Sequence, residues 1–149
     1  MGLILLIEDD GATRRDLCDK LIAKFNCKIE KAYNYSSAIG LWNEYKHSYD
    51  CMILDLHIDP TGLATLKYNK YYPLVGVAFF DDICDGEKIE DKMNIWKKTI
   101  IYSGYIHELI NREREFGWQH KPLKLIPKNT LGIKKVSECV TQILNKLPK

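Results

Sequence analysis

The sequence has no cysteines at CxxC spacing, no long apolar run and no strong excess of charge of one sign. Its five cysteines are scattered, which argues against a structural zinc site and favours reduced core residues in a reducing compartment. The N-terminal apolar run, residues 3–7, is too short for a signal peptide or a membrane span. A net charge of +2 from dispersed basic residues argues against direct nucleic-acid binding. We therefore expect a cytoplasmic protein that binds neither a membrane nor nucleic acid directly.

What the sequence does contain is the alternation of a layered α/β protein. With 149 residues, 46% of them hydrophobic, the chain can bury the core of one domain, and we expect a single domain over residues 1–149. Short apolar runs alternate with segments of helical period, which favours a parallel sheet covered by helices on both faces. The expected strands are residues 3–7, 27–32, 51–54, 99–102 and 123–126.

Helices are expected between these strands. The first covers residues 12–25, and Ser36 or Ser37 is expected to cap the second, which runs to Tyr45. Another covers residues 106–116, and Thr130 is expected to cap a last helix that reaches Leu147. Because that helix ends close to residue 149, we expect no output domain within this chain.

The long segment after the third strand is harder to assign. Residues 76–84 have the spacing of an amphipathic helix, and a buried strand at residues 74–80 is the alternative. Residues 58–72 are expected to form an extra-long loop that holds three tyrosines. Loops of this length usually have a function, so we expect this one near the active site.

Polar side chains follow four of the expected strands. Glu8 and Asp9 follow the first, Asp55 follows the third, Ser103 follows the fourth, and Lys128 follows the fifth. In an open parallel sheet, ligands bind beyond the carboxyl ends of the strands. The sequence therefore predicts that these residues share one site.

The chemistry of that set is restrictive. Carboxylates that lie close together repel one another unless a cation compensates, and Mg²⁺ prefers oxygen ligands. A lysine and a hydroxyl opposite the acids suit a phosphoryl group, since the amine supplies charge and the hydroxyl a hydrogen bond. Asp55 is the expected nucleophile, because a carboxylate can take a phosphoryl group as an aspartyl phosphate.

The residues stand in four segments: LLIEDD (5–10), CMILDL (51–56), TIIYSG (99–104) and LKLIPK (123–128). With these segments the chain resembles the receiver domain of two-component response regulators over nearly its whole length. The resemblance implies a three-layer αβα sandwich with a five-stranded parallel sheet of order 2-1-3-4-5. It also implies a phospho-acceptor switch rather than an enzyme acting on a separate substrate.

The resemblance further implies the role of each site residue. Asp55 accepts the phosphoryl group, Lys128 pairs with it, and Ser103 bonds it in the active state. The implied ligands of Mg²⁺ are Glu8, Asp9, Asp55 and the backbone carbonyl of His57. The implied partners are a histidine kinase or phosphotransfer protein and an unknown downstream protein, which reads the face formed by residues 106–116, the fifth strand and the last helix.

Two departures from the family concern the fifth strand. Leu125 stands where receivers carry an aromatic switch residue, and Asn129 stands where a proline follows the lysine. The alternative function is therefore a non-switching binding module whose inserted loop is the interaction surface. A haloacid-dehalogenase-like phosphatase is less favoured, because His57 stands where that family needs a second aspartate.

A third departure concerns the proline and glycine that open the helix after the acceptor strand. Pro60 and Gly62 compete with Pro73 and Gly76 for this role. We prefer the second pair, because the helical pattern follows it directly. This choice makes residues 58–72 an insertion at the edge of the predicted site.

Overall fold

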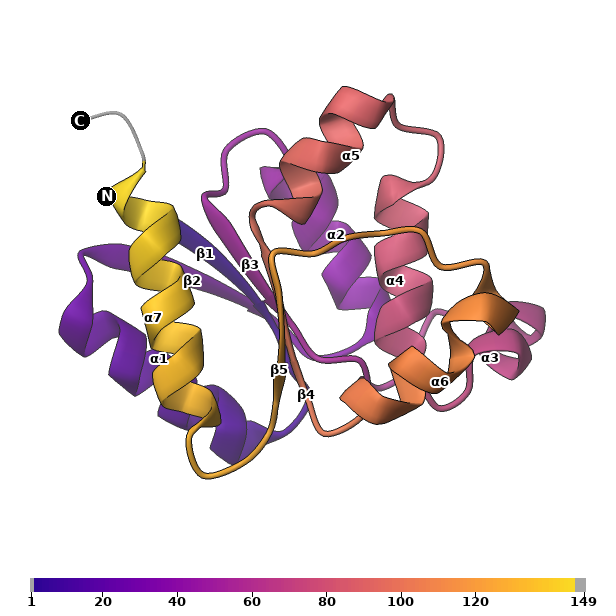
Figure 1. The fold of residues 1–149 in the computed structure, drawn as a ribbon, viewed down its shortest axis with the longest axis horizontal. Helices are drawn as coiled ribbons and strands as arrows, with labels where there is room; N and C mark the ends of the chain where they lie inside the picture. The colour runs from indigo at the N-terminus through magenta and orange to yellow at the C-terminus, as the bar shows by residue number, and fades with distance from the viewer. Residues whose placement is uncertain (1, 147–149) are drawn as a thin grey trace.

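The computed structural model describes residues 2–146, so Leu147 lies outside the described residues. A five-stranded sheet forms the centre of the fold, and all neighbouring strands are parallel. The strand order is β2-β1-β3-β4-β5, which confirms the predicted order, and each strand lies within one residue of its predicted bounds (Figure 1). The strands are β1 (Gly2–Ile7), β2 (Cys27–Ala32), β3 (Cys51–Leu54), β4 (Thr99–Ser103) and β5 (Lys124–Pro127).

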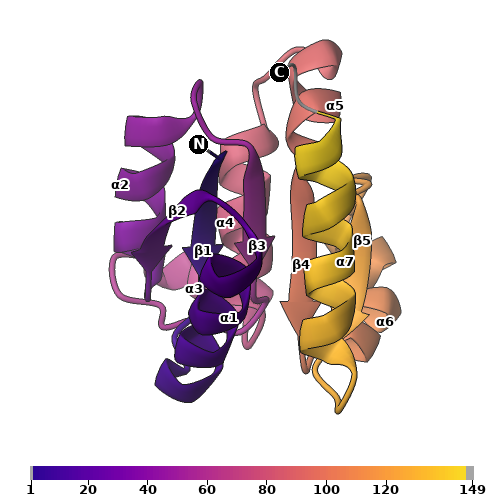
Figure 2. The ribbon, with the colours of Figure 1, turned by 90° about the vertical axis from the view of Figure 1, so that its left-hand side faces the viewer.

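Helices cover both faces of this sheet, which confirms the predicted three-layer sandwich. On one face α1 (Gly11–Lys24) and α7 (Gly132–Asn145) lie side by side, as Figure 2 shows. The other face is covered by α2 (Tyr35–Tyr45), α3 (Thr65–Tyr71), α4 (Val75–Cys84), α5 (Ile89–Trp96) and α6 (Ile106–Phe116). Within residues 2–146, no helix combines the length and apolar character that crossing a bilayer requires.

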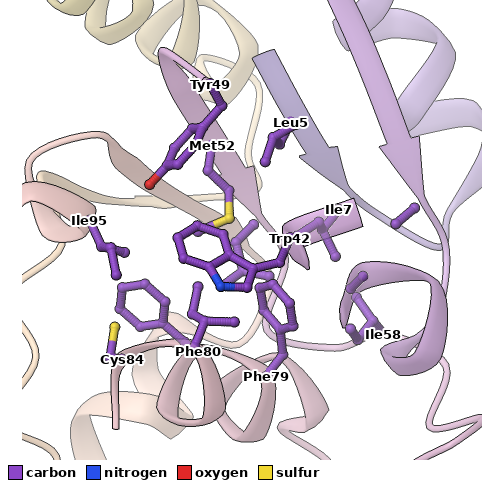
Figure 3. Close-up of a cluster of buried hydrophobic side chains, with 14 of the residues drawn as sticks. Leu5, Ile7, Trp42, Tyr49, Met52, Ile58, Phe79, Phe80, Cys84 and Ile95 are labelled. Carbon is purple, nitrogen blue, oxygen red and sulfur yellow. The ribbon is translucent and has the colours of Figure 1, made fainter. Parts of the chain in front are cut away.

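The core lies on both faces of the central strands. In β1, Ile4 and Leu6 pack under α1 and α7, whereas Leu5 and Ile7 pack under α2 and α4. Burial on both faces explains why the strand is a continuous apolar run rather than an alternating one. Figure 3 shows the cluster that contains Leu5 and Ile7, in which Trp42 lies against the aromatic side chains of α4.

Two predicted helix caps are wrong. The N-cap of α2 is Asn34, whose Oδ1 accepts a hydrogen bond from the Ser37 amide at 2.8 Å, while Ser37 Oγ accepts one from the Asn34 amide at 3.2 Å. Ser37 is thus the third residue of a capping box rather than the cap. At α7 the N-cap is Leu131, not Thr130, and it makes no side-chain cap bond. Asn129 Oδ1 instead accepts the Leu131 amide at 3.1 Å.

Between β3 and β4 the chain forms three helices. The helix α4 confirms the prediction for residues 76–84, and the alternative strand at 74–80 is wrong. The expected loop at 58–72 contains α3, and α5 was not predicted. Tertiary contacts stabilise α3, since the Tyr71 hydroxyl donates to Asp81 at 2.5 Å and Arg112 donates to the carbonyl oxygen of Tyr72 at 2.7 Å.

The preference for Gly76 over Gly62 has a steric basis. The Gly76 amide donates to the carbonyl oxygen of Leu56 at 2.7 Å. A Cβ at this position would overlap the carbonyl oxygen of Asp55 and lie 2.7 Å from the Leu56 Cα. Only glycine allows α4 to begin this close to the segment that carries Asp55. Gly62, at φ 91°, turns the chain beside the start of α2 instead.

Candidate functional site

The strand register brings the predicted polar residues to one edge of the sheet. Ile7 pairs with Leu54, so Glu8 and Asp55 leave neighbouring strands at the same level. Ser103 ends β4, and the Lys128 amide donates to its carbonyl oxygen at 3.1 Å. Four strands therefore deliver acids, a hydroxyl and an amine to the same place.

The centre of the site is an ion-pair bridge. Lys128 Nζ lies 2.6 Å from Glu8 Oε1 and 2.9 Å from Asp55 Oδ2. The other oxygen of Asp55, Oδ1, accepts the His57 amide at 3.2 Å. Glu8 and Asp55 are 1% and 4% exposed, so both carboxyl groups are held inside the protein.

A third acid completes a cluster that could hold a metal ion. Glu8, Asp9 and Asp55 each offer a carboxylate oxygen, and these oxygens all lie within 4.8 Å of one another. When ionised, the three acids and Lys128 leave two negative charges unbalanced, which one divalent cation neutralises. An all-oxygen donor set of this kind suits Mg²⁺.

The buried oxygens of Glu8 give an independent sign that a cation fits. Glu8 Oε2 has no hydrogen-bond partner among the described residues. An unpartnered buried carboxylate oxygen is costly, and such exceptions call for an ion, a water or a catalytic role. The residues present therefore fit a divalent cation at this edge.

The electrostatics lead to the same conclusion. Burial and the neighbouring Asp55 together raise the pKa of Glu8 to about 8, although Lys128 opposes the rise. Burial and Asp55 also raise the pKa of Asp9. Burial lowers the pKa of Lys128, but its bonds to Glu8 and Asp55 outweigh this and raise it. Without a cation, the site resists holding three negative charges together.

Asp10, the next acid in the chain, has a structural role. Its Oδ2 accepts the Thr13 amide at 3.0 Å, which makes Asp10 the N-cap of α1. Arg14, in the first turn of the same helix, donates to the carbonyl oxygen of Glu8 at 3.0 Å. These two contacts tie the start of α1 to the acidic segment and fix its path.

Two aromatic rings stand beside the site, and only one of them was considered in the sequence analysis. The rings of His57 and Tyr105 stack, with centroids 5.0 Å apart and an interplanar angle of 14°. Each follows a predicted site residue by two positions, and the Tyr105 amide donates to Ser103 Oγ at 3.1 Å. That equal spacing after Asp55 and Ser103 is the sequence signal that could have identified Tyr105.

Comparisons with known proteins identify the fold. No family model matches the chain, and no curated protein matches it. Solved receiver domains of response regulators do match in structure. One is the response regulator TrrA from Thermotoga maritima in complex with Mg²⁺-BeF, with 19% identity, a TM-score of 0.63, and coverage of 96% of this chain and 99% of that chain.

Two further structures give the same result. A CheY-like receiver domain protein from Methanospirillum hungatei has 14% identity and a TM-score of 0.63 and covers 98% of this chain and 95% of that chain. A receiver domain protein from Clostridium thermocellum has 15% identity and a TM-score of 0.61, over 98% and 96%. The chain therefore has the fold of response-regulator receiver domains.

Proposed function

We propose that this chain is the phospho-acceptor of a two-component phosphorelay. In this proposal Asp55 takes a phosphoryl group from a histidine kinase or a phosphotransfer protein. The observation that carries the proposal is the Lys128 bridge between Glu8 and Asp55, beside Asp9, at the strand ends of a receiver fold. The cluster combines a nucleophile, a cation and acids for a metal, as phosphoryl transfer to a carboxylate requires.

Each side chain has a distinct part in the transfer. An oxygen of Asp55 forms the bond to phosphorus as the bond from phosphorus to the donor's leaving atom breaks, and the leaving group keeps the electron pair. Lys128, 2.9 Å from Asp55, places positive charge beside the oxygens on which charge develops. Ser103 Oγ accepts the Tyr105 amide and keeps its own proton to donate to the transferred group.

Glu8, Asp9 and Asp55, with the backbone carbonyl of His57, would hold Mg²⁺. When bound, the ion stabilises charge on the transferring oxygens. The buried, unpartnered oxygen of Glu8 supports this assignment, as does the Mg²⁺-BeF complex of the similar TrrA.

The modified domain would signal by protein contact and would not turn over a separate substrate. The surface formed by α6, β5 and α7 adjoins Ser103 and Lys128, so a change at either residue reaches it directly. Leu125 is half-buried within this surface, against the cluster that includes α6. A downstream protein that reads this surface is the expected partner.

The experiment is incubation with acetyl phosphate, with and without Mg²⁺, followed by intact mass measurement. We expect wild type to gain one phosphoryl group only with Mg²⁺, and Asp55→Asn to gain none. The matched control is Asp59→Asn, because Asp59 is exposed in the same loop and accepts the Thr61 amide at 2.9 Å.

The control should be labelled like wild type. Absence of labelling in wild type, under conditions that label a known receiver, would refute the phospho-acceptor proposal. Labelling that persists in Asp55→Asn would show that another residue is the acceptor.

A further inference from the structure

A hollow with an apolar floor lies at the end of the sheet opposite to the acidic site. Ile89 and Met93 of α5 line it on one side, and Leu123 lines it on the other, just before β5; we call this hollow the α5 groove. It is a shallow hollow, open to solvent, with a volume of about 890 Å³. Figure 1 shows α5 at the sheet end farthest from the turn between β4 and α6. The groove is therefore separate from the Asp55 site.

The α5 groove gathers exposed apolar side chains that are otherwise scattered. In the described residues nine large hydrophobic side chains are exposed, and three of them line this groove. Ile89 and Met93, 60% and 55% exposed, are four residues apart and so share one face of α5, whereas Ile95 on another face is buried. Burying exposed apolar side chains of this size favours association, so a cluster of them is a surface suited to binding.

The groove is formed before any partner arrives. The Leu123 amide donates to the carbonyl oxygens of Trp96 and Thr99, each at 2.9 Å, which fixes the wall that faces α5. Trp96 in turn donates its indole N–H to His120 Nδ1 at 3.2 Å. A preformed wall lowers the ordering cost of binding.

The charged side chains that line the groove itself are of one sign. Its charged lining residues are Lys97 and Lys121, and none of residues 2–146 that line it is acidic. Asp91 of α5 lines a different hollow, together with Glu87. Beyond Leu123 the neighbouring hollows add more basic than acidic side chains: the lysines are Lys98, Lys124, Lys135 and Lys146, and the acids are Asp50 and Glu138. In the hollow on the other side of Ile89, two lysines are balanced by Asp81 and Asp85. A partner that complements this surface carries negative charge around an apolar anchor.

We propose that the α5 groove docks an acidic segment of a partner protein, anchored by one or two large apolar side chains. A flat anionic membrane contacts the hollow between α5 and Leu123 less closely than a protruding side chain does. A nucleic acid is also a poorer fit: among the described lining residues there is no arginine, and the single aromatic ring, Trp96, uses its N–H within the protein. The helix-in-groove mode of peptide recognition suits this shape.

The test uses a phage-displayed library of random peptides, selected on the protein of 149 residues. Selected peptides are then made synthetically, and their affinities are measured for wild type and for two groove variants, Ile89→Ser/Met93→Ser and Lys97→Glu/Lys121→Glu. All four substituted side chains are exposed, so both variants should fold. The matched control is Lys20→Glu/Ile22→Ser, which changes exposed residues of α1 in the same way.

We expect selected peptides rich in Asp and Glu with large apolar residues. The apolar variant should weaken their binding about tenfold or more, the charge variant should weaken it several-fold, and the control should leave it unchanged. Failure to select acidic peptides, or equal binding by wild type and both groove variants, would overturn the proposal. The proposal would also be overturned if the protein bound vesicles of phosphatidylcholine and phosphatidylserine, or a single-stranded oligonucleotide, more tightly than the selected peptides, and if both groove variants lost that binding.

Discussion

The buried carboxyl group of Glu8 should make the metal-free protein less stable as pH rises. Its pKa is raised from 4.5 to about 8, chiefly by burial, so the folded state keeps a proton that the unfolded state has lost. The stabilisation by that proton is complete below pH 4.5 and is lost as pH rises from 4.5 to about 8. Glu8→Gln cannot lose a proton there and should escape this loss.

The size of the effect follows from the same values. One pKa unit corresponds to about 1.4 kcal/mol, so the full shift sets an upper limit of about 5 kcal/mol. Lys128 lies 2.6 Å from Glu8 and partly compensates its charge when the proton is lost, so we expect about 2–4 kcal/mol. In EDTA, Glu8→Gln should match wild type near pH 5 and exceed its free energy of unfolding by this amount near pH 9.

Urea unfolding at the two pH values measures this difference. The matched control is Glu87→Gln, because Glu87 is exposed and its loss should change stability equally at both pH values. Adding Mg²⁺ should stabilise wild type near pH 9 and stabilise Glu8→Gln much less. The reasoning is refuted if, in EDTA, the difference in free energy of unfolding between wild type and Glu8→Gln is the same at both pH values.

Three further predictions concern other residues. Gly76→Ala should lower the free energy of unfolding by about 3 kcal/mol or more, because its Cβ would overlap the carbonyl oxygen of Asp55. Gly40→Ala, with nothing within 4 Å of the new Cβ, should leave it unchanged or raise it by about 0.5–1 kcal/mol. Urea unfolding compares the two variants, and equal losses of stability would contradict the steric explanation. Arg112→Ala should cost about 1–2 kcal/mol and speed amide exchange in α3, because its guanidinium donates to three carbonyl oxygens at the end of that helix; unchanged exchange would contradict this role. Asp9→Asn should weaken Mg²⁺ binding about tenfold or more, measured as a loss of thermal stabilisation by Mg²⁺, and an unchanged titration would remove Asp9 from the ligand set.

The strands could be predicted because burial makes them apolar, and the site residues could be predicted because the parallel topology gathers the strand ends. Strands covered on both faces must be apolar throughout, so a charge at the end of such a run stands out in the sequence. The rule that parallel strands place their carboxyl ends at one edge then joins Glu8, Asp55, Ser103 and Lys128 into one site. These residues are far apart in the sequence, but the positions of the strand ends are enough to bring them together.

The helices α3 and α5 could not be predicted in this way, because their stability comes from contacts distant in sequence. In α3 only Tyr71 is buried, so the segment shows no apolar stripe, and its contacts are to Asp81 and Arg112. In α5 the apolar residues Ile89 and Met93 face outward, which hides the amphipathic pattern. The acids in its first turn were the available signal for a helix start.

The buried polar clusters around Asp81 and around Glu8 differ in whether each polar group has a hydrogen-bond partner. Asp81 accepts the Tyr71 hydroxyl at 2.5 Å and lies 3.0 Å from His120 Nε2, while His120 Nδ1 accepts the Trp96 indole N–H at 3.2 Å. Every member of that network has a partner, so it can fix α3, α4 and the segment before β5 without a ligand. Glu8 is buried as deeply, yet one of its oxygens has no partner in the described part of the chain. A residue that served folding alone would be better replaced by an apolar one, so the cost at Glu8 supports the proposal that this cluster holds a cation.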